Sequence, residues 1–390
     1  MPKGTDLDHK DVLFIAANTR SLAVNRGALI RALQERGLSV GALVPDQEFL
    51  QEVHALGVTT WHYHLERHSM GVRGEVARFL ELRRMIRKIA PRAVFAYSVK
   101  PIILGIPAAR LAGVGETYCL ATGLGYLYGR HDRRTRCIRA LVSFCYALSG
   151  SLSQAFFFQN PDDCNELQQN FLFRRFTRSV VVNGSGVDPE EYPFSEPAAV
   201  PLRFLFMGRF LEEKGIREFV DAARRLAPEN PGVEFVALGE VDDSTVNAIG
   251  AAEVAAWREE GIVTLPGRVR DVRGHLQAAS VMVLPSYYRE GIPRSLLEAM
   301  STGRPLITCD SPGCRETVLE GVNGWLVPPG DAAALAGRMQ TFIQDPVLVG
   351  RMGKAGRELA KARFSTELVN QQMLKEMPIA HIERPLEGMA

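Results

Sequence analysis

The chain has 390 residues, of which 46% are hydrophobic and 23% charged, so it is long enough for two globular domains. Its net charge of +2 gives no overall attraction to nucleic acid, and this argues against a nucleic-acid-binding protein. Residues 1–193 hold 24 Lys and Arg against 18 Asp and Glu, whereas the remainder holds 22 against 26; the basic first half therefore suits an anionic partner or surface, with chance variation as the alternative.

The first half of the chain alternates short apolar runs with amphipathic segments, as parallel strands joined by helices do. Residues 11–17 (DVLFIAA) predict a buried strand, and the helix after it is expected to end at Gly37. The predicted strands are residues 11–17, 38–44, 58–62, 94–97, 118–121, 155–158 and 180–182. Helices are predicted over residues 47–56, 76–89 and 102–111, and one is predicted to end near Leu148.

Residues 140–161 carry no charge and must be weighed as a membrane-spanning segment. Ser, Gly and Gln interrupt this stretch, and its apolar density is too low for the roughly 20 residues that cross a bilayer. We therefore predict a helix followed by a buried strand, and a peripheral membrane contact stays open.

Turn-forming residues 183–189 (NGSGVDP) separate this half from a second alternating pattern and indicate a hinge. The predicted strands are then residues 202–207, 233–238, 262–265, 281–284, 306–308 and 325–327. Helices are predicted over residues 215–226, 248–260 and 272–279, with two more to about residue 362 and a last one over 366–377.

These patterns predict an α/β protein of two doubly wound, Rossmann-like domains that face each other across a cleft. The predicted N-terminal domain spans residues 1–187 and the C-terminal domain residues 188–365, and the tail, residues 366–390, is expected to pack back on the first domain. The six cysteines form no CxxC pair and mostly lie in apolar runs, which is typical of free thiols in a reducing compartment. Because the first ten residues are polar, we expect no secretory signal and a cytoplasmic location.

Residues 284–300 (LPSYYREGIPRSLLEAM) contain the first candidate site. They read as the end of a buried strand, a loop shaped by Gly291 and Pro293, and a helix. The N-terminus of a helix attracts anions through its backbone N–H groups and its dipole. Glu290 in the loop and Glu298 in the helix flank this anion site. An anion between two carboxylates fits a nucleotide-sugar, whose diphosphate separates a ribose from a hexose.

Residues 208–215 (GRFLEEKG) follow the first strand of the second domain. Arg209 and Lys214 can converge on phosphate oxygens, Arg through a planar fork and Lys as a point charge. The alternative is a loop of solvated charges that leads into a helix. A third loop, residues 266–271 (PGRVRD), can hold a flat base through its main chain, although an ordinary strand-to-helix turn has the same pattern.

Together, EGIPRSLLEAM, GRFLEEKG, GRVRDV and the later PGCRETV and GVNGWLVPP segments resemble glycosyltransferase family 4, whose members are retaining enzymes with the GT-B fold. The resemblance covers nearly all of residues 200–335. It continues more loosely through YSVKPI, ATGLGYLY, FFQNPDD and VVVNGSGVD of the first domain, which look like bacterial members that assemble exopolysaccharide, capsule or lipid-linked oligosaccharide.

The resemblance implies transfer of a hexose or N-acetylhexosamine from a UDP-sugar to a saccharide acceptor linked to polyprenyl diphosphate. Arg209 and Lys214 would neutralise the leaving diphosphate, and Glu290 would bind the transferred sugar. The implied donor-binding residues are Glu298, Gly208, Arg268, Val269, Gly291, Ile292, Pro293, Arg294, Ser295 and Leu296. Retention without an obvious nucleophile implies front-face attack, and no metal or other cofactor is implied.

The acceptor side departs from the family pattern. Many members carry a His near the transferred sugar, and this chain has Thr122 at the comparable place, before Gly123. His131 is a spatial substitute, although an exposed His in a basic loop is the commoner case. Asn18, after the first strand, is a further candidate. The basic cluster Arg130, Arg133, Arg134 and Arg136 suits the inner leaflet of a membrane, with a solvated helix start as the alternative.

Two possible metal-binding patterns and a dinucleotide-binding function are set aside. Two alternative functions remain open. His62, His64 and His68 have no Cys or carboxylate framework for zinc, and the DxD at residues 6–8 lies in a polar tail. No GxGxxG follows the first strand, which argues against a dinucleotide oxidoreductase. A sugar-nucleotide 2-epimerase shares the GT-B architecture. A non-enzymatic, hinged ligand-binding protein is the third hypothesis, although it needs no diphosphate site.

Overall fold

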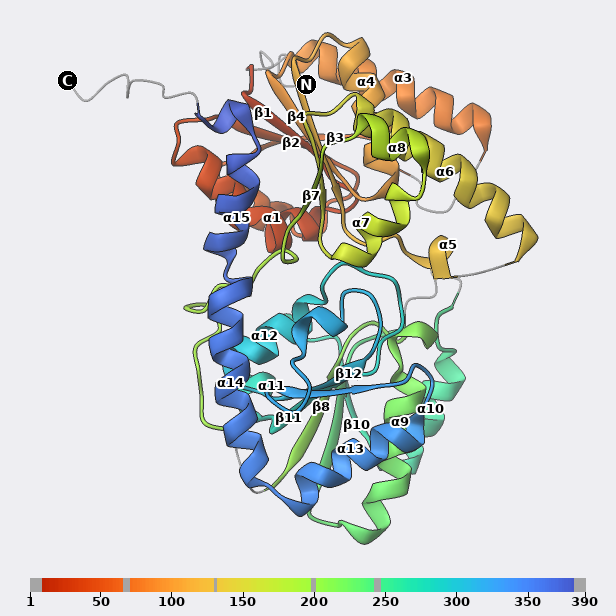
Figure 1. Cartoon of the computed structure of the whole chain (residues 1–390), viewed down its shortest axis with the longest axis vertical. Coiled ribbons are helices and arrows are strands. Elements are labelled where there is room, and N and C mark those ends of the chain that lie inside the picture. Colours follow the sequence, from red (N-terminus) through yellow and green to blue (C-terminus); the bar gives the residue numbers. More distant parts are fainter. Residues whose placement is uncertain (1–8, 66–70, 130–131, 198–200, 242–246, 382–390) are drawn as a thin grey trace, which may run out of the picture. The chain divides into compact units, whose positions relative to one another are not determined.

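A computed structural model describes residues 9–65, 71–129, 132–197, 201–241 and 247–381 (Figure 1). The chain forms two compact units. Unit 1 comprises Met1–Ser185 and Glu367–Ala390, and unit 2 comprises Gly186–Thr366. Each unit is built around its own parallel sheet, so the predicted pair of Rossmann-like α/β domains is confirmed. The predicted cleft remains a prediction, because the placement of the units relative to each other is not determined.

Unit 1 contains a seven-stranded sheet in the order β3-β2-β1-β4-β5-β6-β7. The strands are β1 (Val12–Ile15), β2 (Val40–Val44), β3 (Thr59–His62), β4 (Ala93–Tyr97), β5 (Glu116–Ala121), β6 (Ala155–Phe158) and β7 (Ser179–Val181). The strand pairs are parallel, and the strand order reverses direction between β1 and β4. Loops that follow β1, β4 and β5 therefore leave the sheet at one edge.

Two hydrophobic clusters cover the two faces of this sheet. Val12 and Phe14 of β1 belong to one cluster and Leu13 and Ile15 to the other, because successive strand residues point to opposite faces. The first face packs against α1 (Thr19–Gln34), α2 (Leu50–Ala55) and the C-terminal α15 (Thr366–Lys375). The second face packs against α3 (Val72–Ile89), α4 (Ile106–Leu111), α6 (Arg133–Ser151), α7 (Pro161–Gln168) and α8 (Phe171–Phe176). A four-residue helix, α5 (Tyr126–Gly129), precedes α6.

The helix predicted over residues 102–111 begins with one π-helical segment, Pro101–Gly105, and continues as α4. Helices α7 and α8 were not predicted at all. At eight and six residues they are too short to show a helical hydrophobic period, so only their caps mark them. Asn160 and Asn170 supply these caps, since each accepts hydrogen bonds from backbone N–H groups of the first turn.

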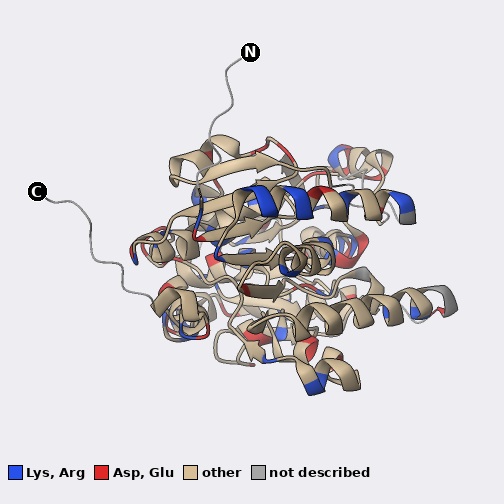
Figure 2. Cartoon of the chain, turned by 90° about the horizontal axis from the view of Figure 1, so that it is seen from above, with Lys and Arg blue, Asp and Glu red and all other residues tan. Residues whose placement is uncertain are grey.

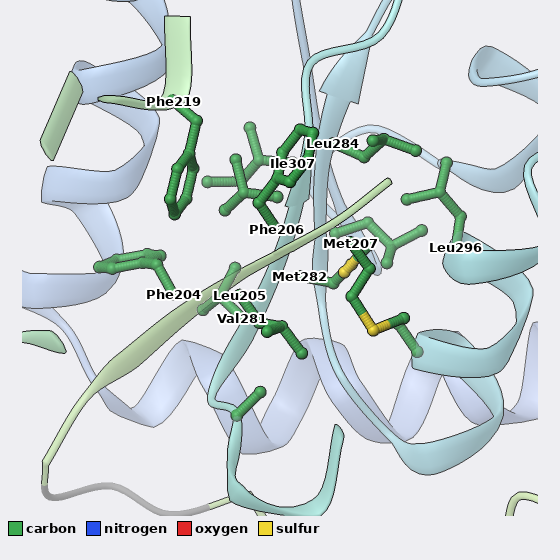
Figure 3. Packing of buried hydrophobic residues seen from close by; sticks show 14 of the residues in the cluster. Phe204, Leu205, Phe206, Met207, Phe219, Val281, Met282, Leu284, Leu296 and Ile307 are labelled. Atoms are coloured by element: carbon green, nitrogen blue, oxygen red, sulfur yellow. The ribbon is translucent and has the colours of Figure 1, made fainter. Parts of the chain in front are cut away.

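Unit 2 contains a six-stranded parallel sheet in the order β10-β9-β8-β11-β12-β13. The strands are β8 (Arg203–Met207), β9 (Glu234–Leu238), β10 (Thr264–Gly267), β11 (Val281–Leu284), β12 (Leu306–Cys309) and β13 (Gly324–Val327). The helices are α9 (Ile216–Leu226), α10 (Ala251–Glu260), α11 (Arg273–Ala278), α12 (Arg294–Thr302), α13 (Ala332–Gln344) and α14 (Val347–Phe364). Figure 3 shows side chains of β8, β11 and β12 meeting Phe219 of α9 and Leu296 of α12 in the core.

The C-terminal segment connects the two cores. α14 contributes buried residues to unit 2, whereas Val369, Met373 and Leu374 of α15 join the cluster on the first face of the unit 1 sheet. Just beyond α15, the backbone N–H of Ile379 donates to a carboxylate oxygen of Glu116, 3.1 Å away. The boundary after Ser185 lies two residues before the one expected from the turn-forming segment.

Candidate active site

The loops that follow β8 and β11 meet at the carboxyl ends of these two central strands of the unit 2 sheet. These two strands are neighbours and parallel, and the strand order reverses between them. The backbone N–H groups of Tyr287 and Tyr288 donate to the carbonyl oxygen of Glu213, at 2.8 and 3.1 Å. In parallel sheets, ligands bind at such a switch point, outside the carboxyl ends of the strands. The geometry therefore joins the two motifs, residues 208–215 and 284–300, in one site.

Gly215 makes this approach possible. Its backbone is left-handed, with φ of 77°, and a Cβ atom there would lie 2.3 Å from the carbonyl oxygen of Pro285. Only glycine combines this conformation with such close backbone contact. Lys214, one residue earlier, is thereby held against the β11 loop.

Lys214 and Glu290 form an ion pair where the loops after β8 and β11 meet. The Lys214 ammonium donates to Oε1 of Glu290, and Oγ of Ser286 lies 3.3 Å from the same oxygen. Lys214 is only 8% exposed, and its ammonium lies 5.9 Å from the centroid of the Tyr288 ring. A buried ammonium requires a partner, and Glu290 supplies it with the aromatic ring as a second contact. The pair places a cation and a carboxylate side by side at the carboxyl ends of β8 and β11.

Arg209 is exposed on the loop after β8, next to Gly208. The following strand end packs closely on this loop, because a Cβ atom at Gly239 would lie 2.0 Å from the carbonyl oxygen of Gly208. This close packing fixes the backbone from which Arg209 projects. The convergence of Arg209 with Lys214 on a ligand remains a prediction.

Glu298 lies in α12 and is buried, at 8% exposure. Its Oε1 accepts hydrogen bonds from the Tyr192 hydroxyl at 3.0 Å and from Nε of Arg294 at 2.7 Å. Burial raises the pKa of the Glu298 carboxyl, and the hydrogen bonds from Arg294 and Tyr192 oppose that rise. The carboxylate is therefore held in one orientation by two donors to a single oxygen.

Tyr192 is a site residue that the sequence analysis missed. It follows the hinge segment, and the pKa of its hydroxyl is raised, first by burial and then by the charge of Glu298. Nη1 of Arg357 in α14 donates to the carbonyl oxygens of Tyr192 and Ser301, at 2.8 and 2.6 Å, so the Tyr192 segment is fixed to α12. The one sequence signal was a pair of aromatic residues, Tyr192 and Phe194, within a polar segment.

The loop from Glu290 to α12 is supported by a second loop, after β12. Gly313 has φ of 84°, and a Cβ atom there would lie 1.5 Å from the carbonyl oxygen of Gly291. The Ser311 hydroxyl donates to the carbonyl oxygen of Ser286, at 2.7 Å. Ile292 is buried in the core, and Pro293 is the residue at the N-terminal end of α12. Arg294, Ser295 and Leu296 form its first turn, as the sequence pattern implied.

The loop after β10 holds Arg268 and Val269. Gly267 has φ of 89°, and its carbonyl oxygen accepts a hydrogen bond from the N–H of Gly239, 3.1 Å away. Arg268 forms an exposed ion pair with Glu240, at 3.3 Å. Exposed pairs of this kind contribute little to stability. The assignment of this loop to a nucleotide base stays a prediction.

In unit 1, hydroxyl groups gather where β4 and β5 end. Oγ of Ser98 lies 3.0 Å from Oγ1 of Thr122, and Gly123 follows with φ of 113°. Ser98 itself has φ of 70°, a left-handed conformation that is unfavourable for a residue with a side chain. The Asn18 side chain accepts the Ser21 N–H at 2.7 Å and so caps α1. Thr122 therefore has a neighbouring hydroxyl, whereas Asn18 has a structural role.

Several predicted residues cannot be placed in a site. Arg130, His131, His68 and the DxD at residues 6–8 lie outside the described residues, as do the side chains of Arg133 and Arg134. Arg136 is exposed on α6, and the rings of His62 and His64 meet edge to face at 5.7 Å.

No cluster of three His, Cys, Asp or Glu with metal-binding geometry occurs in the described ranges. In the same part of the chain, every helix is too short or too polar to cross a bilayer. The six cysteines are free, and four of them are buried.

Two family descriptions match the chain. Residues 201–345 match "Glycosyl transferases group 1", and residues 11–160 match "Glycosyl transferase 4-like".

Curated relatives include bacterial glycosyltransferases. The N,N'-diacetylbacillosaminyl-diphospho-undecaprenol alpha-1,3-N-acetylgalactosaminyltransferase of Campylobacter jejuni is 24% identical over 90% of this chain and 93% of that protein. The putative colanic acid biosynthesis glycosyltransferase WcaL of Escherichia coli is 30% identical over 50% of each chain.

Solved structures share the architecture. Anabaena HepE in complex with UDP and glucose aligns with a TM-score of 0.73 at 18% identity, over 94% of this chain and 99% of that one. Sucrose-phosphate synthase from Thermosynechococcus elongatus aligns with a TM-score of 0.75 at 20% identity, over 94% and 98%. These structural likenesses establish the GT-B fold.

Proposed function

Because the two domains of this chain belong to the glycosyl transferase group 1 and glycosyl transferase 4-like families, we propose that the protein is a retaining, UDP-sugar-dependent glycosyltransferase. It moves a hexose or an N-acetylhexosamine to a saccharide acceptor linked to polyprenyl diphosphate. The product serves the assembly of a bacterial surface polysaccharide or glycan.

The ion pair of Lys214 and Glu290 is the observation that carries this proposal. When the anomeric C–O bond breaks, negative charge develops on the departing diphosphate and positive character on the sugar ring. A buried ammonium aimed at that charge acts in a site of low dielectric, where its stabilisation exceeds what water would allow. Arg209 adds a guanidinium to the same diphosphate from the loop after β8. Glu290 lies beside the ammonium, where its carboxylate accepts hydrogen bonds from hydroxyl groups of the transferred sugar.

Glu298 holds the other end of the donor. Its Oε1 is already occupied by the Tyr192 hydroxyl and Arg294, so Oε2 is directed to the ribose hydroxyls. The first turn of α12, at Arg294, Ser295 and Leu296, presents backbone N–H groups to phosphate. The main chain at Arg268 and Val269 holds the base. Gly208, Gly291, Ile292 and Pro293 shape the backbone between these contacts.

The chemistry proposed for this site is front-face attack. Glu290 is paired with Lys214, and Oγ of Ser286 lies 3.3 Å from the same carboxylate oxygen, so we assign Glu290 to binding the sugar hydroxyls. The acceptor hydroxyl attacks the anomeric carbon on the face from which UDP departs. Its proton passes to the leaving phosphate oxygen, and UDP is released. No metal or other cofactor takes part.

The acceptor class is drawn from the relatives. The C. jejuni relative is described as acting on a diphospho-undecaprenol-linked sugar, and the E. coli relative as acting in colanic acid biosynthesis. A UDP donor is consistent with the complexes of Anabaena HepE with UDP and with UDP-glucose. The acceptor meets unit 1, at Thr122 and Gly123, and the reaction takes place at the inner leaflet of the membrane.

UDP release tests the proposal. Purified protein is incubated with UDP-GlcNAc, UDP-GalNAc, UDP-Gal, UDP-Glc or GDP-Man, with and without a panel of saccharides linked to polyprenyl diphosphate. At least one UDP-sugar should release UDP only when acceptor is present. Conversion of the donor to its 2-epimer without acceptor would favour the epimerase hypothesis instead. Absence of UDP release with every donor and acceptor pair would overturn the proposed reaction.

A further inference from the structure

The outer side of α6 is apolar, which is unusual for a helix at the surface of a water-soluble unit. Its inner side packs Tyr146 and Ala147 into the core of unit 1. Leu141, Phe144 and Leu148 point outward at spacings of three and four residues, and Leu141 is 61% exposed. Surface helices normally carry polar residues at these positions. α6 therefore has a second apolar stripe that the core of unit 1 does not use.

α8 lies beside α6 and adds to this stripe (Figure 1). Phe173 is buried against the rings of Phe156 and Phe158, at centroid distances of 5.2 and 5.9 Å. Phe171, Leu172 and Phe176, in contrast, are exposed.

A glycine in α6 permits the close packing of the two helices. A Cβ atom at Gly150 would lie 2.3 Å from Oγ1 of Thr177, directly after α8. We call Leu141, Phe144, Leu148, Phe171, Leu172 and Phe176 the α6–α8 face.

The two helices are also strongly basic. The sequence of α6 contains Arg133, Arg134, Arg136 and Arg139, that of α8 contains Arg174 and Arg175, and neither helix contains Asp or Glu. Arg136, Arg174 and Arg175 are exposed. The nearest acids in sequence are Asp132, which caps α6 through the N–H of Thr135, and three residues of α7: Asp162, the buried Asp163 and Glu166. α3, on the same face of the sheet, carries Lys and Arg along its C-terminal half (Figure 2).

We propose that the α6–α8 face is a membrane-docking surface that inserts its apolar side chains between the headgroups of an anionic bilayer. Contiguous exposed apolar residues mark interaction sites. Here they lie on two helices that contain Arg but no Asp or Glu, and this combination matches an anionic lipid surface. A second copy of the chain fits less well, because a two-fold contact through this face would bring like-charged Arg residues together. The proposal rests on the proposed function for its purpose, which is to bring unit 1 to a lipid-linked acceptor.

Co-sedimentation with vesicles tests the docking surface without donor or acceptor. The full chain is mixed with vesicles of phosphatidylcholine alone or with about 30% phosphatidylglycerol, in 100 mM NaCl. The natural sequence should sediment with the anionic vesicles and stay in solution with the neutral ones. The double variants Leu141→Ser/Phe144→Ser and Arg174→Glu/Arg175→Glu should each reduce the partition coefficient at least about tenfold. Unchanged thermal melting shows that the variants are folded.

Matched substitutions on unit 2 serve as controls. Val347→Ser removes an apolar side chain that is 77% exposed on α14, and Arg258→Glu reverses an exposed charge on α10. Both should bind vesicles as the natural sequence does. Failure of the natural sequence to bind anionic vesicles would overturn the proposal, as would double variants that bind these vesicles as strongly as the natural sequence does. Vesicle-independent dimers that Leu141→Ser/Phe144→Ser abolishes would instead assign the face to self-association. UDP release with a short-chain, water-soluble acceptor reports on the reaction without a membrane. Failure of the docking proposal is therefore distinguishable from failure of the proposed reaction.

Discussion

Lys214 and Glu290 are 76 residues apart in the sequence, yet the ammonium of one donates directly to the carboxylate of the other. They lie on the loops that follow β8 and β11. These strands are adjacent in the sheet, and Gly215 lets the two loops touch. The pair thus depends on the order of the strands and not on sequence proximity. It gives unit 2 a buried cation at the edge where parallel sheets bind ligands.

Tyr192→Phe tests whether the Tyr192 hydroxyl positions Glu298. The change removes one hydrogen bond to Oε1 and leaves the aromatic ring, so unfolding should become easier by only about 1 kcal/mol. The KM for the UDP-sugar should rise several-fold with a smaller change in kcat, because the proposed contact of Glu298 with the donor depends on the orientation of its carboxylate. Steady-state UDP release measures both constants.

Tyr118→Phe is the matched control for that variant, since Tyr118 also donates to a carboxylate, that of Glu116 in unit 1. It should lose similar stability and keep the natural KM for the donor. An unchanged KM in Tyr192→Phe would show that Glu298 is held without the tyrosine.

Gly215→Ala tests the close approach of the two site loops. The new methyl group would meet the carbonyl oxygen of Pro285, in a backbone conformation that already disfavours alanine. We expect a loss of at least about 2 kcal/mol in the free energy of unfolding. Gly261→Ala has nearly the same φ, 71°, with nothing within 4 Å of the new atom, so it should lose only about 1 kcal/mol. Equal losses, measured by thermal or urea unfolding, would remove the steric argument.

The titration of Glu298 should appear in the pH dependence of stability. Burial raises its pKa above the usual value of 4.5, so the folded chain holds a proton at pH values where the unfolded chain has lost it. This contribution to stability is fully present below pH 4.5 and is lost as pH rises through the folded pKa. The difference in unfolding free energy between the natural sequence and Glu298→Gln should therefore change with pH just above 4.5. A difference that is flat across pH 4–7 would contradict a raised pKa.

Thr122→Val tests the hydroxyl pair at the ends of β4 and β5. The substitution preserves the shape of the side chain and removes the group that lies 3.0 Å from Oγ of Ser98. If unit 1 holds the saccharide acceptor there, the KM for the acceptor should rise about tenfold while the KM for the UDP-sugar stays constant. Thr60→Val, an intermediate-exposure threonine on β3 at the edge of the same sheet, should leave both constants unchanged. A larger effect on the donor than on the acceptor would contradict this placement.

The sequence predicted the sheets well because their strands are buried on both faces and read as continuous apolar runs. Residues 281–284 and 155–158 match β11 and β6 in full. α7 and α8 could not be predicted in this way, since they are shorter than two or three turns and lack a readable period.

The sequence predicted the charged residues of the candidate site but not the residues that hold them in place. Glu290, Glu298 and Lys214 stood out because charged residues and glycines follow apolar strands. Tyr192 reaches Glu298 across 106 residues, and Gly313 packs on Gly291 through backbone atoms alone, so neither contact leaves a local pattern. Such contacts follow from the tertiary arrangement, which a local pattern does not contain.

The most direct test of the account is UDP release by Lys214→Ala, measured on the same donor and acceptor as the natural sequence. If this buried cation stabilises the leaving diphosphate as proposed, its removal should lower kcat/KM about 100-fold or more. Lys354→Ala, which removes an exposed ion pair with Glu196 in the same unit, should leave kcat/KM unchanged. A folded Lys214→Ala variant, judged by its thermal melting, that retains the natural kcat/KM would contradict the assignment of this edge as the donor site.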